Sequence, residues 1–442
     1  MTRFLFAAMP AAGHVAPLVP VAHELADRGH TVAWYTGRQY RETVIAAGAS
    51  FLPHVHARDI DVGRLDEELP GRVGKKGLAR FRFDMREVFI AAVPGQVADL
   101  ETYLERVRPD VLVAEPGMAG ACSVIEQRHR VPWATCNITA LAMRSVDTAP
   151  FGLGLAPASS ALGRLRNRAL NAVIYRTLFR GIDRDYRAMR AALGLAPTRD
   201  DLFDMTLSPY LYLQPTVPSF EYPRSDLAPQ VHFVGPLLPP APADFAPPPW
   251  WDELSSGRPV VLVTQGTVAT DPQELLLPAL EALRDEPVQV IAVTGGANPG
   301  ELPAAPPNAR VESFVPFAAL MPHVSVLVSN GGYGGLHYAL AHGVPLVLAG
   351  ATEEKPELVG RVNRCGVGVG IRTQHPRPDR LRAAVRQVLA RPEYASRAAA
   401  IEAEMTRYHG PARAADLLEE LATTRAPVLS AAAHAPPTAR PL

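Results

Sequence analysis

Two polar residues follow apolar runs at places where a catalytic group is expected. His14 comes shortly after the apolar run Arg3–Ala8, and Glu115 directly follows the apolar run Val111–Ala114. If both runs are parallel strands, both side chains lie at the carboxyl end of a sheet, where ligands bind. A histidine has a pKa close to neutrality and is suited to removing a proton from a hydroxyl group. The residues alone equally allow His14 to cap a helix that starts near Ala16.

A glycine-rich turn later in the chain has the features of an anion site. The apolar run Val326–Val328 leads into the turn Asn330–Gly335, and a helix is expected over Leu336–His342. Glycines let the backbone approach a ligand closely, and the first amides and the dipole of a helix favour an anion. The alternative is a tight turn without a ligand. The turn lacks the Lys-Ser/Thr pair of a phosphate loop, and it does not follow the first strand, as a dinucleotide fingerprint would.

Apolar runs of strand length alternate with helical patterns in both halves of the chain, which is typical of parallel βαβ units. The first half has expected strands at Arg3–Ala8, His30–Tyr35, Ser50–Leu52, Val111–Ala114, Pro132–Cys136 and Val231–Val234. The second half has them at Val260–Thr264, Val288–Val293, Val311–Val315, Val326–Val328 and Leu346–Leu348. Two such halves predict an α/β protein with two doubly wound, Rossmann-like domains that face a central cleft.

Length and composition agree with a two-domain enzyme and exclude several other classes. A chain of 442 residues is too long for one ordinary core. The 44 basic and 44 acidic residues cancel, so the chain lacks the basic footprint of a nucleic-acid binder. The three cysteines form no CxxC pair, which indicates a reducing compartment without a structural zinc site. No apolar run is long enough to span a membrane, and we expect a cytoplasmic protein.

Several segments together resemble one enzyme family. They are Asn308–Phe317, His323, Asn330–Gly335, His342–Pro345, Thr352–Pro356 and Gly366–Gly368 in the second half, with Gly13–His14, Pro17 and Arg28–His30 in the first. The pattern resembles the nucleotide-sugar-dependent glycosyltransferases of the GT-B fold, which act on macrolides, other antibiotics and plant secondary metabolites. The resemblance spans nearly the whole chain. It implies the GT-B fold and transfer of a sugar from a UDP- or dTDP-sugar.

The resemblance also implies a role for individual residues that bind the donor. Phe314 occupies the position that stacks on the nucleobase, and the backbone of Val315 the position that binds the base edge. The diphosphate contacts match Gly266 and Thr267 of the strand-end turn, Asn330, and the backbone of Gly332, Tyr333, Gly334 and Gly335. Glu354 and Lys355 match the pair that holds the sugar hydroxyls.

Three of these positions depart from the family pattern. Asn330 replaces the usual histidine beside the diphosphate and keeps a hydrogen-bond donor without the positive charge. Tyr338 stands where many relatives have a glutamate for the ribose hydroxyls. Lys355 replaces a glutamine, and a solvated charge beside Glu354 is the alternative to a role in sugar or phosphate binding.

On the acceptor side, the resemblance implies that His14 is the catalytic base and that Glu115 replaces an aspartate that orients it. The reaction would be one in-line displacement that inverts the anomeric configuration, without a metal or other cofactor. The triplets Asp59–Asp61 and Asp183–Asp185 match a metal-binding Asp-x-Asp pattern, but neither follows a convincing strand, and we interpret both as charged surface. An insertion over residues 137–201 is expected to cover the substrate. Candidate acceptor-pocket residues, which the sequence cannot separate from ordinary core, are Phe81, Phe83, Met85, Phe89, Met143 and Phe151.

We therefore predict an inverting glycosyltransferase that acts on a hydroxyl of a small lipophilic natural product. Two alternatives are a non-catalytic homologue that activates a partner enzyme and a GT-B sugar-nucleotide epimerase. The expected domains are residues 1–217 for the acceptor and 218–404 for the donor, a helix over 405–424 that returns to the first domain, and a disordered tail over 425–442. The sequence leaves open whether the chain is a monomer or a homodimer.

Overall fold

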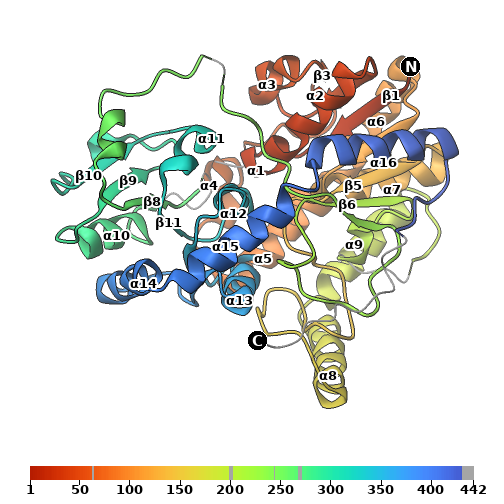
Figure 1. Ribbon diagram of the computed structural model, residues 1–442. Coiled ribbons are helices and arrows are strands. Elements are labelled where there is room, and N and C mark those ends of the chain that lie inside the picture. The colour runs from red at the N-terminus through yellow and green to blue at the C-terminus, as the bar shows by residue number, and fades with distance from the viewer. Residues whose placement is uncertain (62–63, 199–202, 243, 267–270, 431–442) are drawn as a thin grey trace.

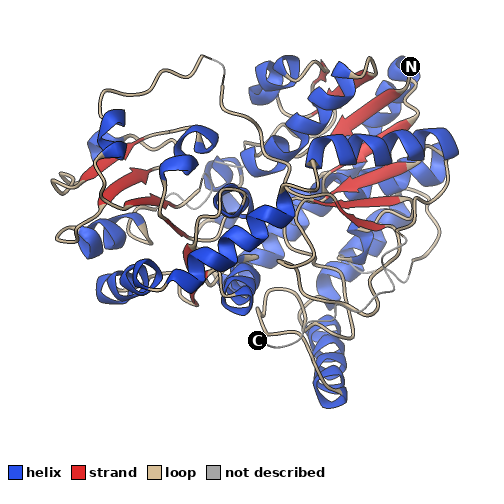
Figure 2. Cartoon of the chain, viewed as in Figure 1, coloured by secondary structure: helices blue, strands red, loops and turns tan. Residues whose placement is uncertain are grey.

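The protein, described from a computed structural model, is built on two separate parallel β-sheets, one in each half of the chain (Figure 1). The structure describes residues 1–61, 64–198, 203–242, 244–266 and 271–430. All strand pairs in both sheets are parallel. Helices lie on both faces of each sheet (Figure 2). Because parallel sheets are buried on both faces, their strands are continuous apolar runs rather than alternating ones.

The first sheet has seven strands in the order β3-β2-β1-β4-β5-β6-β7. They are β1 (Arg3–Ala7), β2 (Thr31–Tyr35), β3 (Ser50–Leu52), β4 (Val111–Ala114), β5 (Trp133–Cys136), β6 (Leu211–Gln214) and β7 (Val231–Phe233). Phe4 of β1 is in register with Val32 of β2 on one side and Val111 of β4 on the other. The strand order therefore reverses between β1 and β4, and a doubly wound sheet binds its ligand at such a point. His14 follows β1 and Glu115 follows β4.

The second sheet has six strands in the order β10-β9-β8-β11-β12-β13. They are β8 (Val260–Thr264), β9 (Gln289–Val293), β10 (Ala309–Glu312), β11 (Val326–Ser329), β12 (Leu346–Ala349) and β13 (Gly368–Ile371). Its order reverses between β8 and β11. Gly266 follows β8 and Asn330 follows β11, so the predicted diphosphate turns lie at the second switch point.

The helices fall into the same two halves. The first half contains α1 (Ala12–Val15), α2 (Val19–Asp27), α3 (Arg41–Ala46), α4 (Leu65–Glu68), α5 (Gly77–Asp84), α6 (Val93–Val107), α7 (Ala119–His129), α8 (Ala161–Thr177) and α9 (Arg180–Ala192). The second half of the sequence contains α10 (Leu276–Leu283), α11 (Phe317–Leu320), α12 (Tyr333–Leu340), α13 (Lys355–Cys365), α14 (Pro378–Ala390), α15 (Pro392–Met405) and α16 (Gly410–Thr424).

Successive residues of a central strand enter different cores. Phe4 and Phe6 of β1 pack into one buried cluster, whereas Leu5 and Ala7 pack into another on the opposite face of the sheet. The alternation follows from the two-residue period of a strand, and it requires helices on both faces. Each sheet is therefore a rigid support whose carboxyl edge carries the loops.

The last helix, α16, crosses back to the first half. Its residues Leu417, Leu418 and Leu421 belong to the same buried cluster as Phe4 and Phe6. At the surface, Arg28 donates to Asp416 (2.7 Å) and to Glu419 (3.2 Å) on α16. In Figure 1 the blue ribbon of α15 and α16 runs along the second half and then over the first.

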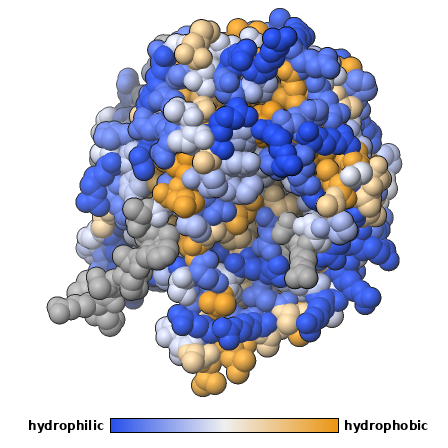
Figure 3. Space-filling view, turned by 90° about the vertical axis from the view of Figure 1, so that its right-hand side faces the viewer, coloured by the Kyte–Doolittle hydropathy of each residue, from blue (hydrophilic) through white to orange (hydrophobic). Residues whose placement is uncertain are grey.

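The insertion between β5 and β6 forms helices α8 and α9. α8 extends away from the body at the lower edge of Figure 1, and hydrophobic residues gather at the same lower end in Figure 3. Leu162, Leu165 and Val173 of this helix are largely exposed. Among the described residues, no helix has both the length and the apolarity needed to cross a membrane.

Some predicted boundaries are wrong. The strand expected over Val311–Val315 is β10, which starts earlier, at Ala309, and ends at Glu312, opposite Val293, the last residue of β9. The first sheet continues past the predicted boundary at residue 217, because β7 pairs with β6. The predicted disordered tail over 425–442 begins too early, since Val428 is buried and its N–H donates to Tyr210 O (2.9 Å). The rest of that tail, residues 431–442, lies outside the described residues.

Candidate active site

His14 and Glu115 form a hydrogen-bonded pair at the first switch point. His14 Nδ1 lies 2.7 Å from Glu115 Oε2. An ionised carboxylate can only accept, so the proton is on Nδ1 and the lone pair of Nε2 is left available. Nε2 makes no hydrogen bond to any described residue, and the side chain is 25% exposed. His14 lies inside the α1 turn and does not cap the helical segment that starts at Ala16, so the capping alternative is wrong.

Glu115 is completely buried, yet its carboxylate is surrounded by donors. Its Oε1 accepts from the N–H of Met9 (3.0 Å), and its Oε2 accepts from the N–H of Gly117 (2.8 Å) as well as from His14. Hydrogen bonds of this kind stabilise the charged form of a buried carboxylate. The extra methylene of glutamate is thus accommodated, and the pairing predicted from the sequence is present in the structure.

The pKa of His14 is raised above its ordinary value of 6.5. Burial alone lowers the pKa of a histidine, but the charge and hydrogen bond of Glu115 and the charge of Glu354 act in the opposite direction and outweigh it. The imidazolium form of His14 is therefore stabilised, as a base that receives a proton during a reaction requires.

Glu354 comes from the other half of the chain and lies within charge range of His14. It immediately precedes α13, and its own pKa is raised, first by burial and then by the charge of Glu353, while His14 acts to lower it. Each group thus alters the titration of the other. The two halves place a carboxyl group of the second sheet's loops near the histidine of the first.

The glycine turn opens α12, which starts earlier than expected, at Tyr333. The N–H groups of Gly332, Tyr333, Gly334 and Gly335 make no hydrogen bond to any described residue, as expected for the first turn of a helix. Gly334 is exposed, and a Cβ at this position or at Gly332 would meet nothing within 4 Å. Four backbone donors and the positive end of a helix dipole therefore remain available to an anion.

The side chain of Asn330 makes its hydrogen bond to another part of the protein. Its side-chain amide is buried and donates to the backbone carbonyl of Gln265, which joins the end of β11 to the end of β8. Gln265 in turn accepts from Leu276 N (2.7 Å) and donates to Asp271 O (2.6 Å). Sequence reasoning missed Gln265, although its place directly before Gly266 was a usable signal. Gly266 adopts a positive φ of 78°, and Thr267 lies outside the described residues.

Phe314 and Val315 follow β10 in an exposed loop. The Phe314 ring is 69% exposed, which is unusual for a large aromatic side chain, whereas the Val315 side chain is buried. Neither the N–H nor the carbonyl of Val315 makes a hydrogen bond to a described residue. The loop thus offers a flat aromatic face beside an unpaired backbone donor and acceptor, which a planar base could use.

Comparisons with known proteins identify the family. Residues 275–421 match the model of the "Erythromycin biosynthesis protein CIII-like, C-terminal domain". The chain is 46% identical, over 95% of its length and 99% of the relative's, to 4'-demethylrebeccamycin synthase of Lentzea aerocolonigenes. It is 35% identical, over 90% of both chains, to UDP-glucosyltransferase 1 of Beauveria bassiana. The chain belongs to the natural-product glycosyltransferase family.

Solved structures agree with this assignment at the level of the fold. The glycosyltransferase superposes on the glycosyltransferase of kitacinnamycin with a TM-score of 0.72 and 23% identity, covering 95% of this chain and 98% of the other. A calicheamicin glycosyltransferase gives a TM-score of 0.71 and 22% identity, covering 97% and 100%. The predicted GT-B fold is confirmed.

Two tyrosine side chains of the glycosyltransferase are held by hydrogen bonds to distant parts of the protein. Tyr333 points away from the turn, and its hydroxyl accepts a hydrogen bond from Gln214 (2.8 Å) at the end of β6. Only the backbone of Tyr333 is thus available for a ligand. The Tyr338 hydroxyl donates to Pro239 O (2.6 Å) in the segment that links the two halves. Tyr338 therefore anchors the linker through its hydroxyl.

Lys355 of the glycosyltransferase is buried, so a solvated charge is wrong as an account of this residue. Its Nζ lies 3.2 Å from Glu353 Oε2, and Glu353 itself adopts a left-handed φ of 57°. The aliphatic stem of Lys355 packs against the glycine turn. A Cβ on Gly331 would lie 3.6 Å from both Cβ and Cγ of Lys355. The Lys355 stem is thus buried against Gly331, the residue directly before the glycines whose amides are available.

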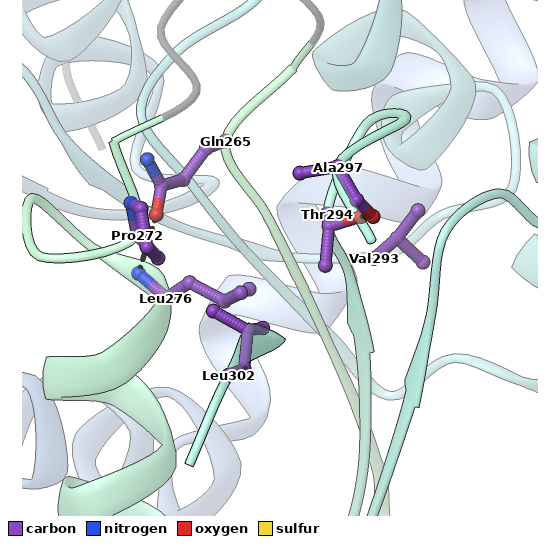
Figure 4. A pocket seen from close by; sticks show the side chains of 7 residues that line it. All are labelled: Gln265, Pro272, Leu276, Val293, Thr294, Ala297 and Leu302. Atoms are coloured by element: carbon purple, nitrogen blue, oxygen red, sulfur yellow. Dashed lines mark hydrogen bonds between the residues drawn. The ribbon is translucent and has the colours of Figure 1, made fainter. Parts of the chain in front are cut away.

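A small, mainly apolar pocket lies at the ends of β8 and β9 (Figure 4). It is lined by Gln265, Pro272, Leu276, Val293, Thr294, Ala297 and Leu302. The turn after β9 is tied to the end of β10, since Thr294 N donates to Glu312 O (3.0 Å) and Gly296 N to Ser313 O (3.0 Å). The pocket therefore borders the loop that carries Phe314, and no sequence pattern predicted it.

The candidate acceptor residues divide into two groups. Met143 and Phe151 line a second pocket, together with Leu141, Tyr222, Arg224, Glu357 and others. The remaining four, Phe81, Phe83, Met85 and Phe89, pack against the buried clusters of the first half. Two of the six candidates thus line a pocket, and the other four are half-buried side chains packed on the core.

The Asp-x-Asp triplets show no arrangement typical of a metal site. Asp185 lies on α9 and accepts a hydrogen bond from Arg86. Asp59 accepts from the N–H of Arg38 (3.3 Å) and lies 3.5 Å from His54. Within the described ranges, no group of three or more His, Cys, Asp or Glu side chains could hold a metal ion.

Proposed function

We propose that the chain is an inverting glycosyltransferase that moves a sugar from a UDP- or dTDP-sugar to a hydroxyl of a small lipophilic natural product, with no metal ion. The observation that carries the proposal is the His14–Glu115 pair, with Nδ1 of His14 2.7 Å from the carboxylate and Nε2 unpaired. The geometry is that of a general base with an orienting acid. His14 also lies close enough to Glu354, in the loop between β12 and α13, for the charge of Glu354 to raise the pKa of His14.

In the proposed reaction, His14 Nε2 takes the proton of the acceptor hydroxyl while the acceptor oxygen attacks the anomeric carbon. The bond between that carbon and the diphosphate oxygen breaks, and the electron pair leaves with the nucleoside diphosphate. Glu115 stabilises the imidazolium that forms. Attack from the side opposite the leaving group inverts the anomeric configuration.

The negative charge that develops on the leaving group needs compensation, and the second half supplies donors for it. The four amides of Gly332–Gly335 lie at the positive end of α12, and the stem of the buried Lys355 lies against Gly331, which precedes them. Preorganised donors of this kind can replace a metal ion in stabilising a diphosphate. Phe314 is proposed to stack on the base, and Glu354 to bind the sugar hydroxyls.

The relatives support the donor and acceptor classes. One is described as a UDP-glucosyltransferase, and another is named for the synthesis of 4'-demethylrebeccamycin. A nucleotide sugar and a natural-product acceptor are the corresponding proposals for this chain.

The test is a thermal-shift screen with UDP, dTDP and GDP and their sugars, followed by NMR of the product formed with the sugar that stabilises most. We expect stabilisation by UDP or dTDP, unchanged turnover in EDTA, and a product of inverted anomeric configuration. Retention of configuration would contradict the single displacement, and a shift with none of the nucleotides would contradict the donor site.

A further inference from the structure

Glu357, in the first turn of α13, connects the two halves of the molecule. Its Oε1 accepts from Gly152 N (3.0 Å) and Gly154 N (2.7 Å), which belong to the insertion of the first half. The Glu357 side chain is buried and lies three residues after Glu354. A carboxylate of the donor half therefore holds the backbone of a segment next to Phe151, a residue that lines the second pocket.

Gly154 and Gly360 lie where α13 packs closely against its neighbours. Neither position has room for a side chain larger than the hydrogen atom of glycine. A Cβ on Gly154 would lie 2.1 Å from Pro356 O, and Gly154 adopts a left-handed φ of 56°. A Cβ on Gly360 would lie 2.3 Å from the Tyr222 hydroxyl. The fit fixes the start of α13 against the segment with little freedom to slide.

A buried arginine completes the connection. Arg361 has no exposed surface; it donates to Glu357 Oε2 (2.9 Å) and, through Nε, to Glu221 Oε1 (2.8 Å). Glu221 Oε2 accepts from Leu141 N (3.1 Å), at the start of the same segment. The network thus runs from α13 to both ends of residues 141–154, and sequence reasoning missed all of it because its members are far apart in the chain.

We propose that Glu357 is a positioning residue that couples the acceptor-side segment 141–154 to the start of α13, and so fixes Glu354 opposite His14. The inference rests on the proposed function. It predicts that binding of the donor sugar affects binding of the acceptor through segment 141–154. Binding of the nucleotide part of the donor, at Phe314 and α12, should not depend on Glu357.

The test uses Glu357→Gln in the full chain, which keeps the size of the side chain and removes the charge that pairs with Arg361. We expect kcat for glycoside formation to fall at least tenfold and the KM of the acceptor to rise. The Kd for UDP or dTDP alone should change less than twofold. In the wild type, the nucleotide sugar should slow amide hydrogen exchange in residues 141–154, and the variant should lose this effect.

Glu286→Gln is the matched control. Glu286 is also a carboxylate paired with arginines, Arg386 (2.7 Å) and Arg382 (3.5 Å), and its side chain is 8% exposed, but it lies between α10 and α14. The Glu286→Gln substitution should lower the melting temperature of the protein without changing kcat. Gly154→Ala serves if Glu357→Gln does not fold, since it disturbs the close contact while keeping the buried charges, and it should show the same kinetic pattern.

Three results would overturn the inference. They are an unchanged kcat in Glu357→Gln, an equal loss of kcat in Glu286→Gln, and an absence of any effect of the nucleotide sugar on exchange in residues 141–154 of the wild type. A failure of the proposed function is distinguishable, because the wild type itself would then transfer no sugar.

Discussion

At the scale of single residues, the carboxylate of Glu115 is fully buried and surrounded by hydrogen-bond donors. Two backbone amides and the His14 ring supply its hydrogen bonds, so removing the carboxylate would leave these donors poorly satisfied and the ring without its orienting partner. The same carboxylate is a main cause of the raised pKa of His14. Orientation and pKa can therefore be tested with one substitution.

Glu115→Gln should lower kcat by about 10²-fold or more, the scale of a lost acid–base contribution. Because His14 must be neutral to act as a base, kcat/KM of the wild type should fall as the pH drops through a pKa above 6.5. Without the negative charge, the imidazolium is less stable, and this limb should move to lower pH. A pH–rate profile of both proteins measures the shift, and identical limbs would argue against His14 as the titrating base.

The residues of the site were only partly predictable from the sequence. His14 and Glu115 follow recognisable strands, so the strand pattern places both at the carboxyl edge of a sheet, and the family resemblance implies that they pair. The directions of Asn330 and Tyr333 could not, because each is fixed by a partner far away in the sequence, Gln265 and Gln214. Side chains of this kind reveal their role only when the partner's position is known.

At the scale of elements, helix α12 contains glycines at positions where alanine would ordinarily make a helix more stable. Glycine in a helix costs roughly 0.5–1 kcal/mol relative to alanine. Gly334 is exposed in the first turn, with nothing near its missing Cβ. The structure therefore gives no packing reason for glycine there, and close approach of a ligand to the backbone is the remaining physical reason.

Gly334→Ala should accordingly stabilise the protein slightly, by up to about 1 kcal/mol, and weaken binding of the nucleotide sugar at least tenfold. Denaturant unfolding and calorimetry measure the two effects. An alanine variant that binds the donor as tightly as the wild type would show that α12 does not approach the diphosphate.

Elements with strong apolar runs were predicted well, and those that depend on tertiary contacts were not. Ser50–Leu52, Val111–Ala114 and Val260–Thr264 match the observed strands. β13 was missed because two glycines interrupt its pattern; a Cβ on Gly368 would lie 1.9 Å from Leu346 O, so glycine is required by the neighbouring strand. Propensity alone argues against a strand at such a position.

At the scale of the whole molecule, α16 makes the end of the chain part of the first half. Leu418 is fully buried with β1 residues. Leu418→Ala should cost about 2–5 kcal/mol of unfolding free energy, because it leaves a cavity under α16. Urea unfolding checks this value, with Leu429→Ala, an exposed position, as the control. Equal midpoints in the two variants would show that α16 adds little to the first half.

In both sheets, the loops that carry the candidate site residues lie where the strand order reverses. His14 and Glu115 lie at the switch point of the first sheet, and the amides of Gly332–Gly335 lie at that of the second. We therefore expect the two sites to contribute separately, the first to proton removal and the second to nucleotide binding.

The most direct test of that claim compares His14→Ala with Phe314→Ala, measuring glycoside formation and nucleotide affinity for both. We predict that His14→Ala abolishes glycoside formation and leaves the Kd for UDP or dTDP nearly unchanged. Phe314→Ala should raise that Kd, because the base loses its stacking partner. Undiminished turnover in His14→Ala would contradict the assignment of the base, and with it the account as a whole.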